Sequence, residues 1–189
     1  MVEADARGVD RGAPQHLLLS HAAGMVPGMD DLLNDIETAV ASGSWTLALI
    51  GTLALPDICA ALEHKSGRTD SERYQRWWER NLGPTYPLLD AQELWQLRNS
   101  MIHQGRSSGR RYERLVFVRA GSGMVLHNNV FNGALNLDLP TFCADVMNAV
   151  QRWRAALAGT DDYERHAEHL LRWHPDGLAP YVVGVPVLS

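Results

Sequence analysis

The sequence contains very little of two residue types, lysine and cysteine. Lysine occurs once, at Lys65, and cysteine twice, at Cys59 and Cys143. Two cysteines cannot build the several disulfide bridges of a small secreted scaffold, which excludes that class. Both lie in stretches with helical apolar spacing, so we expect buried, reduced thiols. This cysteine usage predicts a protein of a reducing compartment, and we expect a cytoplasmic one.

Long apolar runs are also missing. The longest, from Trp45 to Leu55, is interrupted by Gly51 and followed by Pro56, whereas a membrane-spanning helix needs about 20 apolar residues. Near the N-terminus the charges alternate in sign around a short apolar run at 17–19, which is not the pattern of a signal peptide. We therefore expect a soluble protein with no membrane partner.

Charge is unevenly distributed along the chain. The formal net charge is −5 at pH 7, which argues against a whole surface that coats nucleic acid. Segment 98–119 differs, because its six arginines and one acid give a local charge of +5 and leave −10 for the rest. This segment predicts a region that attracts anions. We assign Arg106, Arg110 and Arg111 within it as candidate substrate-binding residues.

Apolar residues recur at helical spacing through most of the chain. We expect a flexible N-terminal arm over 1–28, a helical domain over 29–175 and an extended C-terminal tail over 176–189. Sequences of the form Thr/Asp-x-x-Glu predict capping boxes that open helices at Thr69, Asp90 and Asp161. The helices are expected near 32–40, 45–62, 69–82, 90–104, 140–158 and 161–173.

The apolar spacing changes to alternation in the region 112–139. Strands are expected over 112–119, 124–127 and 130–139, with the Gly-Ser-Gly sequence at 121–123 as a turn. The predicted fold class is therefore mainly α: a helical bundle with a small β-hairpin or meander insertion.

The helix expected over 90–104 carries the most informative segment. Leu94, Leu97 and Met101 form its apolar stripe, and Arg98, Asn99 and His103 lie beside that stripe. A histidine can exchange a proton near neutral pH, a guanidinium can neutralise charge on phosphorus-bound oxygens, and an amide can orient either partner. These three residue types suit phosphodiester chemistry, and we expect Arg98 and His103 to be partly exposed.

The nine residues 97–105 resemble the signature of the HEPN family (higher eukaryote and prokaryote nucleotide-binding domains), which is Arg-polar-x-x-x-His. The resemblance extends over 30–158 and implies a HEPN-like helical bundle, to which the β segment is an addition. It implies a metal-independent endoribonuclease of a toxin or antiphage system, with no cofactor and no metal. Arg98 and His103 would be catalytic and Asn99 supporting. The position two residues after the histidine, a tyrosine in some HEPN toxins, is Gly105 here, so modification of that tyrosine has no acceptor.

The resemblance also implies partners. RNA would be the substrate, an antitoxin or regulatory protein could bind the chain, and motif helices of two protomers would face one another in a homodimer. Geometry favours the same assembly, because His103 is five positions after Arg98 and the two side chains therefore leave the helix about 140° apart. We expect His103 of one protomer to work with Arg98 of the other.

The sequence also allows interpretations other than a HEPN-type ribonuclease. A bare Arg-x4-His spacing occurs again at Arg11 and His16, and a helix ending in His103 and Gly105 is also an ordinary C-terminus. The chain could therefore be a non-catalytic HEPN-like module that binds a nucleotide or a protein. A purely structural helical dimer is a third, weaker alternative. His127 is a further candidate for substrate binding, and the pair at 77–78, two tryptophans, is expected in the core. A helical metal site is a weaker candidate, formed by Asp162, His166 and His169.

Overall fold

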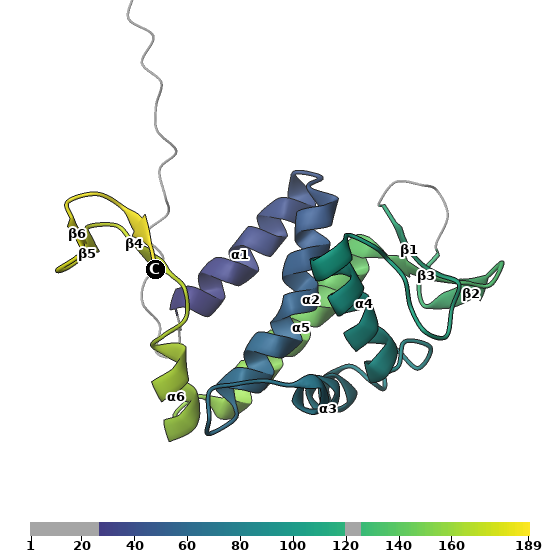
Figure 1. Cartoon of the computed structure of the whole chain (residues 1–189), viewed down its shortest axis with the longest axis horizontal. Coiled ribbons are helices and arrows are strands. Elements are labelled where there is room, and N and C mark those ends of the chain that lie inside the picture. The colour runs from purple at the N-terminus through teal and green to yellow at the C-terminus, as the bar shows by residue number, and fades with distance from the viewer. Residues whose placement is uncertain (1–26, 120–125) are drawn as a thin grey trace, which may run out of the picture.

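The computed structural model describes residues 27–119 and 126–189, and these form a mainly α-helical domain (Figure 1). The expected arm over 1–28 lies almost wholly outside the described residues, as does the expected turn at 121–123. The helices are α1 (Pro27–Ala41), α2 (Trp45–Leu62), α3 (Ser71–Asn81), α4 (Ala91–Gln104), α5 (Leu139–Leu157) and α6 (Asp161–Ala167). The strands are β1 (Arg114–Val118), β2 (Asn129–Phe131), β3 (Ala134–Asp138), β4 (Trp173–His174), β5 (Gly177–Leu178), β6 (Val182–Val183) and β7 (Val187–Leu188).

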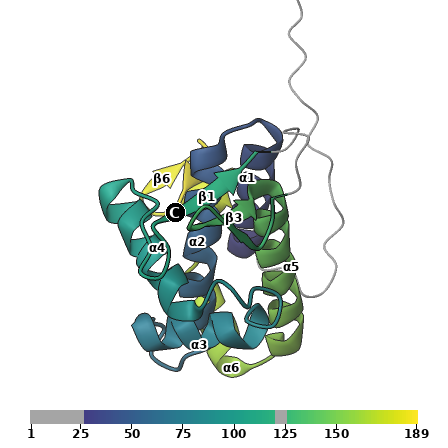
Figure 2. The same cartoon turned by 90° about the vertical axis from the view of Figure 1, so that its right-hand side faces the viewer.

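Helix α2 forms the centre of the bundle. It is apolar on all sides and packs against α1, α3, α4 and α5 (Figure 2), as expected of a helix surrounded by others. The helix continues through Pro56 and does not restart there. Among the described helices only α2 is long and apolar enough to cross a membrane, but 56% of it is buried inside the domain, as in the core helix of a soluble protein.

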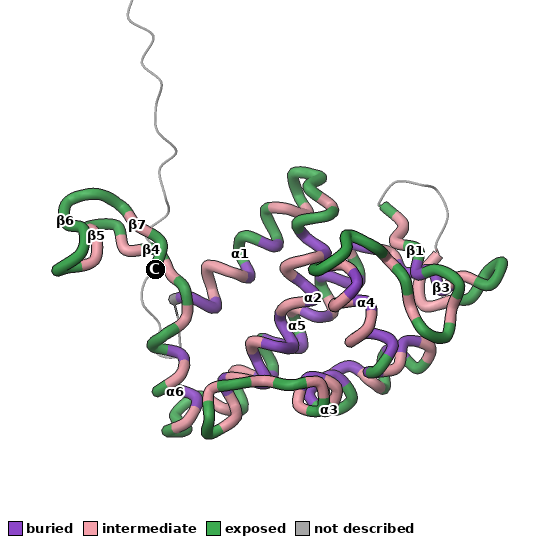
Figure 3. Tube along the Cα trace, in the orientation of Figure 1, coloured by how far each residue is buried: buried purple, intermediate pink, exposed green. Residues whose placement is uncertain are grey.

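The tryptophans expected in the core are there. Trp77 and Trp78 of α3 are fully buried, and their rings meet Trp153 and Phe142 of α5 edge-on or tilted. Aromatic pairs of this geometry stabilise a core beyond the area that they bury. Burial follows the inner faces of α2, α3 and α5 (Figure 3), and α3 packs against both α2 and α4.

Three helices begin at an aspartate whose carboxylate accepts a backbone N–H. Asp70 caps α3, Asp90 caps α4 and Asp138 caps α5. The prediction that Thr69 opens α3 is therefore wrong by one residue. No cap bond is made by a side chain at the start of α6, where the N-cap is Thr160.

The β insertion contains a parallel pair that alternation alone did not reveal. Strand β3 lies between the other two, parallel to β1 and antiparallel to β2. The single strand expected over 130–139 is broken by Asn132 and Gly133, both with positive φ, which is the backbone of a tight hairpin turn. The β2–β3 hairpin therefore lies almost wholly within the segment expected as one strand, and β1 pairs with the other edge of β3. The described residues of the strand expected over 124–127, which are 126 and 127, are not in a strand.

The chain beyond α6 differs from the expected long helix and plain extended tail. Helix α6 ends at Ala167, not near Trp173, and the residues after it fold back into two short antiparallel ladders, β4 with β7 and β5 with β6. We refer to residues 171–189 as the C-terminal arm. Figure 1 shows it beside the start of α1, at the opposite end of the molecule from the β1–β3 sheet.

Candidate functional site

The candidate site lies at the C-terminal end of α4. Gly105 ends the helix in the left-handed region (φ +64°), where its N–H bonds to the Met101 carbonyl. The Ser100 hydroxyl is buried and lies within 3.1 Å of three carbonyl oxygens, those of Leu97, Arg106 and Ser108. The loop after α4 is therefore folded back against the helix that carries the motif.

Arg98 is held between two helices. Its Nε lies 2.6 Å from Oδ2 of Asp57 on α2, and its Nη1 donates a hydrogen bond of 2.9 Å to Oδ1 of Asn99. The guanidinium carbon also lies 5.3 Å from the centre of the Trp95 ring, within the range of a cation–π contact. Three neighbours thus fix the direction of the guanidinium while 21% of its side chain stays exposed.

Asp57 is the residue that the sequence analysis missed. It is buried, and burial raises its pKa above the ordinary value, while the Arg98 guanidinium offsets part of that rise. The close contact with Arg98 is not an aligned hydrogen bond, and neither Asp57 oxygen finds a donor among the described residues. A lone acid inside the most apolar helix was a signal in the sequence, because burying such a group is costly unless it has a partner.

Glu93 holds the loop that follows the motif. The sequence predicted that it would cap its own helix, but its fully buried carboxylate accepts the backbone N–H groups of Arg110 and Arg111 at 2.8–3.0 Å. A Cβ at Gly109 would lie 1.7 Å from Glu93 Oε1, so this close approach requires glycine. The backbone of the arginine-rich loop is thereby held against the first turn of α4 at Gly109, Arg110 and Arg111.

His103 and Asn99 lie on the open side of the helix. His103 is exposed in the last turn of α4 and Asn99 is half-buried. The exposure of Arg98 and His103 agrees with the expectation from their place beside the apolar stripe. Arg98, however, turns toward α2 and Asp57, whereas His103 has no hydrogen bond to a described residue. One protomer therefore does not bring the two groups together.

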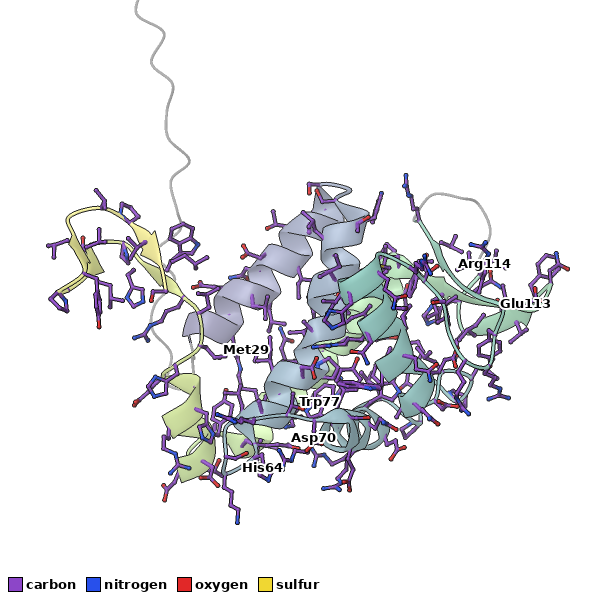
Figure 4. All side chains as sticks on the ribbon, in the orientation of Figure 1. Met29, His64, Asp70, Trp77, Glu113 and Arg114 are labelled. Atoms are coloured by element: carbon purple, nitrogen blue, oxygen red, sulfur yellow. The ribbon has the colours of Figure 1, made fainter. Side chains whose placement is uncertain are left out.

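A polar hollow opens directly after the motif. It measures about 450 Å³ and contains two arginines and one acid. Figure 4 labels Glu113 and Arg114 where the loop enters β1, on the side of the molecule that carries the sheet. Arg114 was not among the substrate-binding residues expected from the sequence, because only the fold of the loop places it on the hollow. The hollow is lined by Gly105, Arg106, Ser107, Ser108, Glu113 and Arg114.

The other expected substrate-binding residues do not line this hollow. The Arg110 guanidinium lies 3.4 Å from Asp90, and that of Arg111 lies over the Tyr112 ring. His127 accepts the backbone N–H of Asp138 at 3.1 Å and packs edge-on against Tyr86. These contacts hold His127 at the start of α5.

The three residues considered for a metal are not gathered. Asp162 pairs with Arg165, and the His166 ring lies against the Leu62 carbonyl. His169 follows the end of α6, so the helical face assumed for it is interrupted. Nowhere in 27–119 or 126–189 do three acidic, histidine or cysteine side chains converge as metal ligands would.

Comparison with known proteins adds no relative. The chain matches no protein-family model, no curated protein and no solved structure.

Proposed function

We propose that this protein is a HEPN-type, metal-independent endoribonuclease that cleaves RNA with Arg98 and His103, as a toxin or antiphage effector. The observation that carries the proposal is the arrangement at the end of α4. Asp57 and Asn99 orient a guanidinium, an exposed imidazole follows on the same helix, and Ser100 and Glu93 hold the basic loop after the motif against that helix.

The chemistry requires one proton acceptor and one charge stabiliser. The 2′-hydroxyl of RNA attacks the adjacent phosphorus while His103 removes its proton, and the bond from phosphorus to the 5′-oxygen breaks. His103 then returns the proton to that oxygen, so the products are a 2′,3′-cyclic phosphate and a 5′-hydroxyl. The Arg98 guanidinium neutralises charge on the non-bridging oxygens in the transition state.

The proposed active unit is a homodimer. Arg98 and His103 leave α4 about 140° apart with a rise near 7.5 Å, and Arg98 already faces Asp57 of its own chain. Pairing two α4 helices across a two-fold axis would set His103 of one protomer near Arg98 of the other, as in an isologous interface. Ile102, 39% exposed beside His103, gives that contact some apolar surface.

The hollow beside the motif would hold the rest of the substrate. Arg106 and Arg114 make no ion pair with a described residue and are exposed, so both remain free to contact phosphates. Contacts of this kind are screened by salt. The proposal therefore includes binding of RNA that weakens steeply as the ionic strength rises.

A non-catalytic role has one observation in its favour. Asp57 already neutralises much of the Arg98 charge, as it would if Arg98 served mainly to join α2 to α4. The chain would then be a HEPN-like module whose basic loop binds a nucleotide or a protein, such as an antitoxin or a regulatory partner. Both readings place the ligand at the same end of α4.

The growth of cells after induced expression of the protein distinguishes the ribonuclease proposal from the binding-module proposal. We expect the wild-type chain to arrest growth and to degrade cellular RNA, and we expect His103→Ala to do neither. His169→Ala is the matched control, since His169 is also exposed and lies outside the site. Equal toxicity of the wild type and His103→Ala would remove the catalytic assignment and favour the binding module.

A further inference from the structure

The C-terminal arm exposes an unusual amount of apolar surface. Of the twelve large apolar side chains that are exposed in the described residues, seven belong to the arm, and Tyr181 and Val183 reach 80% and 73% exposure. Soluble monomers rarely leave so many such groups together in water. The arm residues concerned are Leu171, Trp173, Tyr181, Val182, Val183, Val185 and Leu188.

The arm has a defined shape and a defined attachment. Its two ends are joined by paired backbone hydrogen bonds between Arg172 and Ser189, at 2.9 and 3.0 Å. At its base, the Trp173 N–H donates to Asp31 of α1, and Gly28 packs so closely on Leu171 that a Cβ would lie 2.7 Å from the Leu171 carbonyl oxygen. The arm is therefore fixed at the N-terminal end of α1, as Figure 4 shows near Met29.

A complementary apolar surface runs along the same helix, from Leu32 to the helix's C-terminal end. A groove of about 350 Å³ runs between α1 and α2, with Leu32, Ile36 and Ala39 on one wall. Leu47 stands on the other wall and is 67% exposed. The arm of the same chain does not cover this groove, because Leu47 stays exposed and Figure 1 shows the arm extending from the start of α1 away from α2.

We propose that the arm of one protomer fills the α1–α2 groove of a second copy of this chain. If two α1 helices lie antiparallel across a two-fold axis, the arm at the start of one α1 meets the end of the other. Each copy then gives an arm and receives one, so both surfaces are covered at once and the assembly closes. This contact is separate from the α4 pairing and does not rest on the proposed ribonuclease function.

The apolar surface of the arm is large enough for that partner. Trp173 and Tyr181 are aromatic side chains of about 150–250 Å² each and are 56% and 80% exposed, which leaves roughly 200–340 Å² on these two residues alone. The five exposed aliphatic side chains of the arm, and the groove of the same chain, add to this area, toward the ~800 Å² that each partner gives to a stable interface.

The mass of the particle in solution tests the proposal. Val183→Asp in the arm and Leu47→Asp in the groove should each halve the molecular mass measured by light scattering, whether or not α4 also pairs. Val130→Asp is the matched control, because Val130 is 47% exposed on β2, away from both surfaces, and its mass should equal that of the wild type. Unchanged mass in Val183→Asp would overturn the proposal.

A cross-link between chains tests the pairing itself. Cys59 and Cys143 are buried, so they do not compete with cysteines introduced at exposed positions. Leu47→Cys chains mixed with Val183→Cys chains should form a disulfide-linked pair under mild oxidation. If Val183→Asp halves the mass but Leu47→Asp does not, or if this cross-link fails to form, the arms pair elsewhere and the groove assignment is wrong.

Discussion

The Arg98 guanidinium faces Asp57, with 2.6 Å between Nε and Oδ2, and this contact joins the motif helix to the central helix of the bundle. The pair is mostly buried, and the Asp57 oxygens receive no aligned hydrogen bond from the described residues. Removing one partner of such a pair leaves an uncompensated charge, which usually costs more than the pair contributes. Arg98 therefore contributes to the stability of the fold as well as to the proposed chemistry.

Replacing Arg98 by leucine should make stability depend on pH. The pKa of Asp57 is already raised by burial, and losing Arg98 removes the group that offsets the rise. A raised folded-state pKa means that stability is retained at low pH and lost as the pH rises through that pKa. We expect Arg98→Leu to lose about 3 kcal/mol near neutral pH, with the loss shrinking on acidification.

Urea unfolding at about pH 7 and about pH 5 measures this effect. The double variant Asp57→Asn with Arg98→Leu is the control, because it has no carboxylate to leave unpaired, and its loss should hardly change between the two conditions. If Arg98→Leu lowers the free energy of unfolding by the same amount at both pH values, then Arg98 does not compensate the charge of Asp57.

Replacing Glu93 by glutamine should loosen the loop after the motif. A glutamine keeps one acceptor but turns a donor toward the N–H groups of Arg110 and Arg111, which Glu93 now binds. We expect a loss of about 2 kcal/mol in the free energy of unfolding, with faster amide exchange at both arginines. Glu113→Gln, at an exposed position of the same loop, should change neither quantity, and an equal response of the two variants would contradict the assigned role.

The shared site should be restored in mixed dimers. Arg98→Ala chains that also carry Asp57→Asn lack the arginine, and His103→Ala chains lack the imidazole. A dimer containing one of each would keep one complete site, so mixing should return roughly a quarter of wild-type cleavage if chains exchange at random. Mixtures no more active than the separate variants would mean that each site lies within one chain.

The sequence was sufficient for the parts of the fold that depend on local spacing. The apolar pattern placed the helices and the tryptophan core, and Gly105 marked the end of α4. The β1–β3 pairing could not be predicted, because alternation shows that a strand exists but not which strand lies beside it. The helix predicted to reach Trp173 ends at Ala167, and Leu170 and Leu171 pack against Gly28 at the start of α1, a contact that local spacing does not reveal.

The candidate site was predictable only in part. Arg98, Asn99 and His103 were found because they share one helix, and their spacing is local. Asp57 lies 41 residues earlier in the chain and reaches Arg98 only through packing of α2 on α4. Glu93 looked like a helix cap, and only the folded loop shows that it binds the backbone of Arg110 and Arg111 instead.

Cleavage of a short RNA by the purified protein in excess EDTA is the most direct test of the central claim. The wild type should leave a 2′,3′-cyclic phosphate end, His103→Ala should be slower by about 10²–10⁴-fold, and His169→Ala should match the wild type. Wild-type protein that leaves the RNA intact, cleavage that requires a divalent ion, or undiminished cleavage by His103→Ala would contradict it.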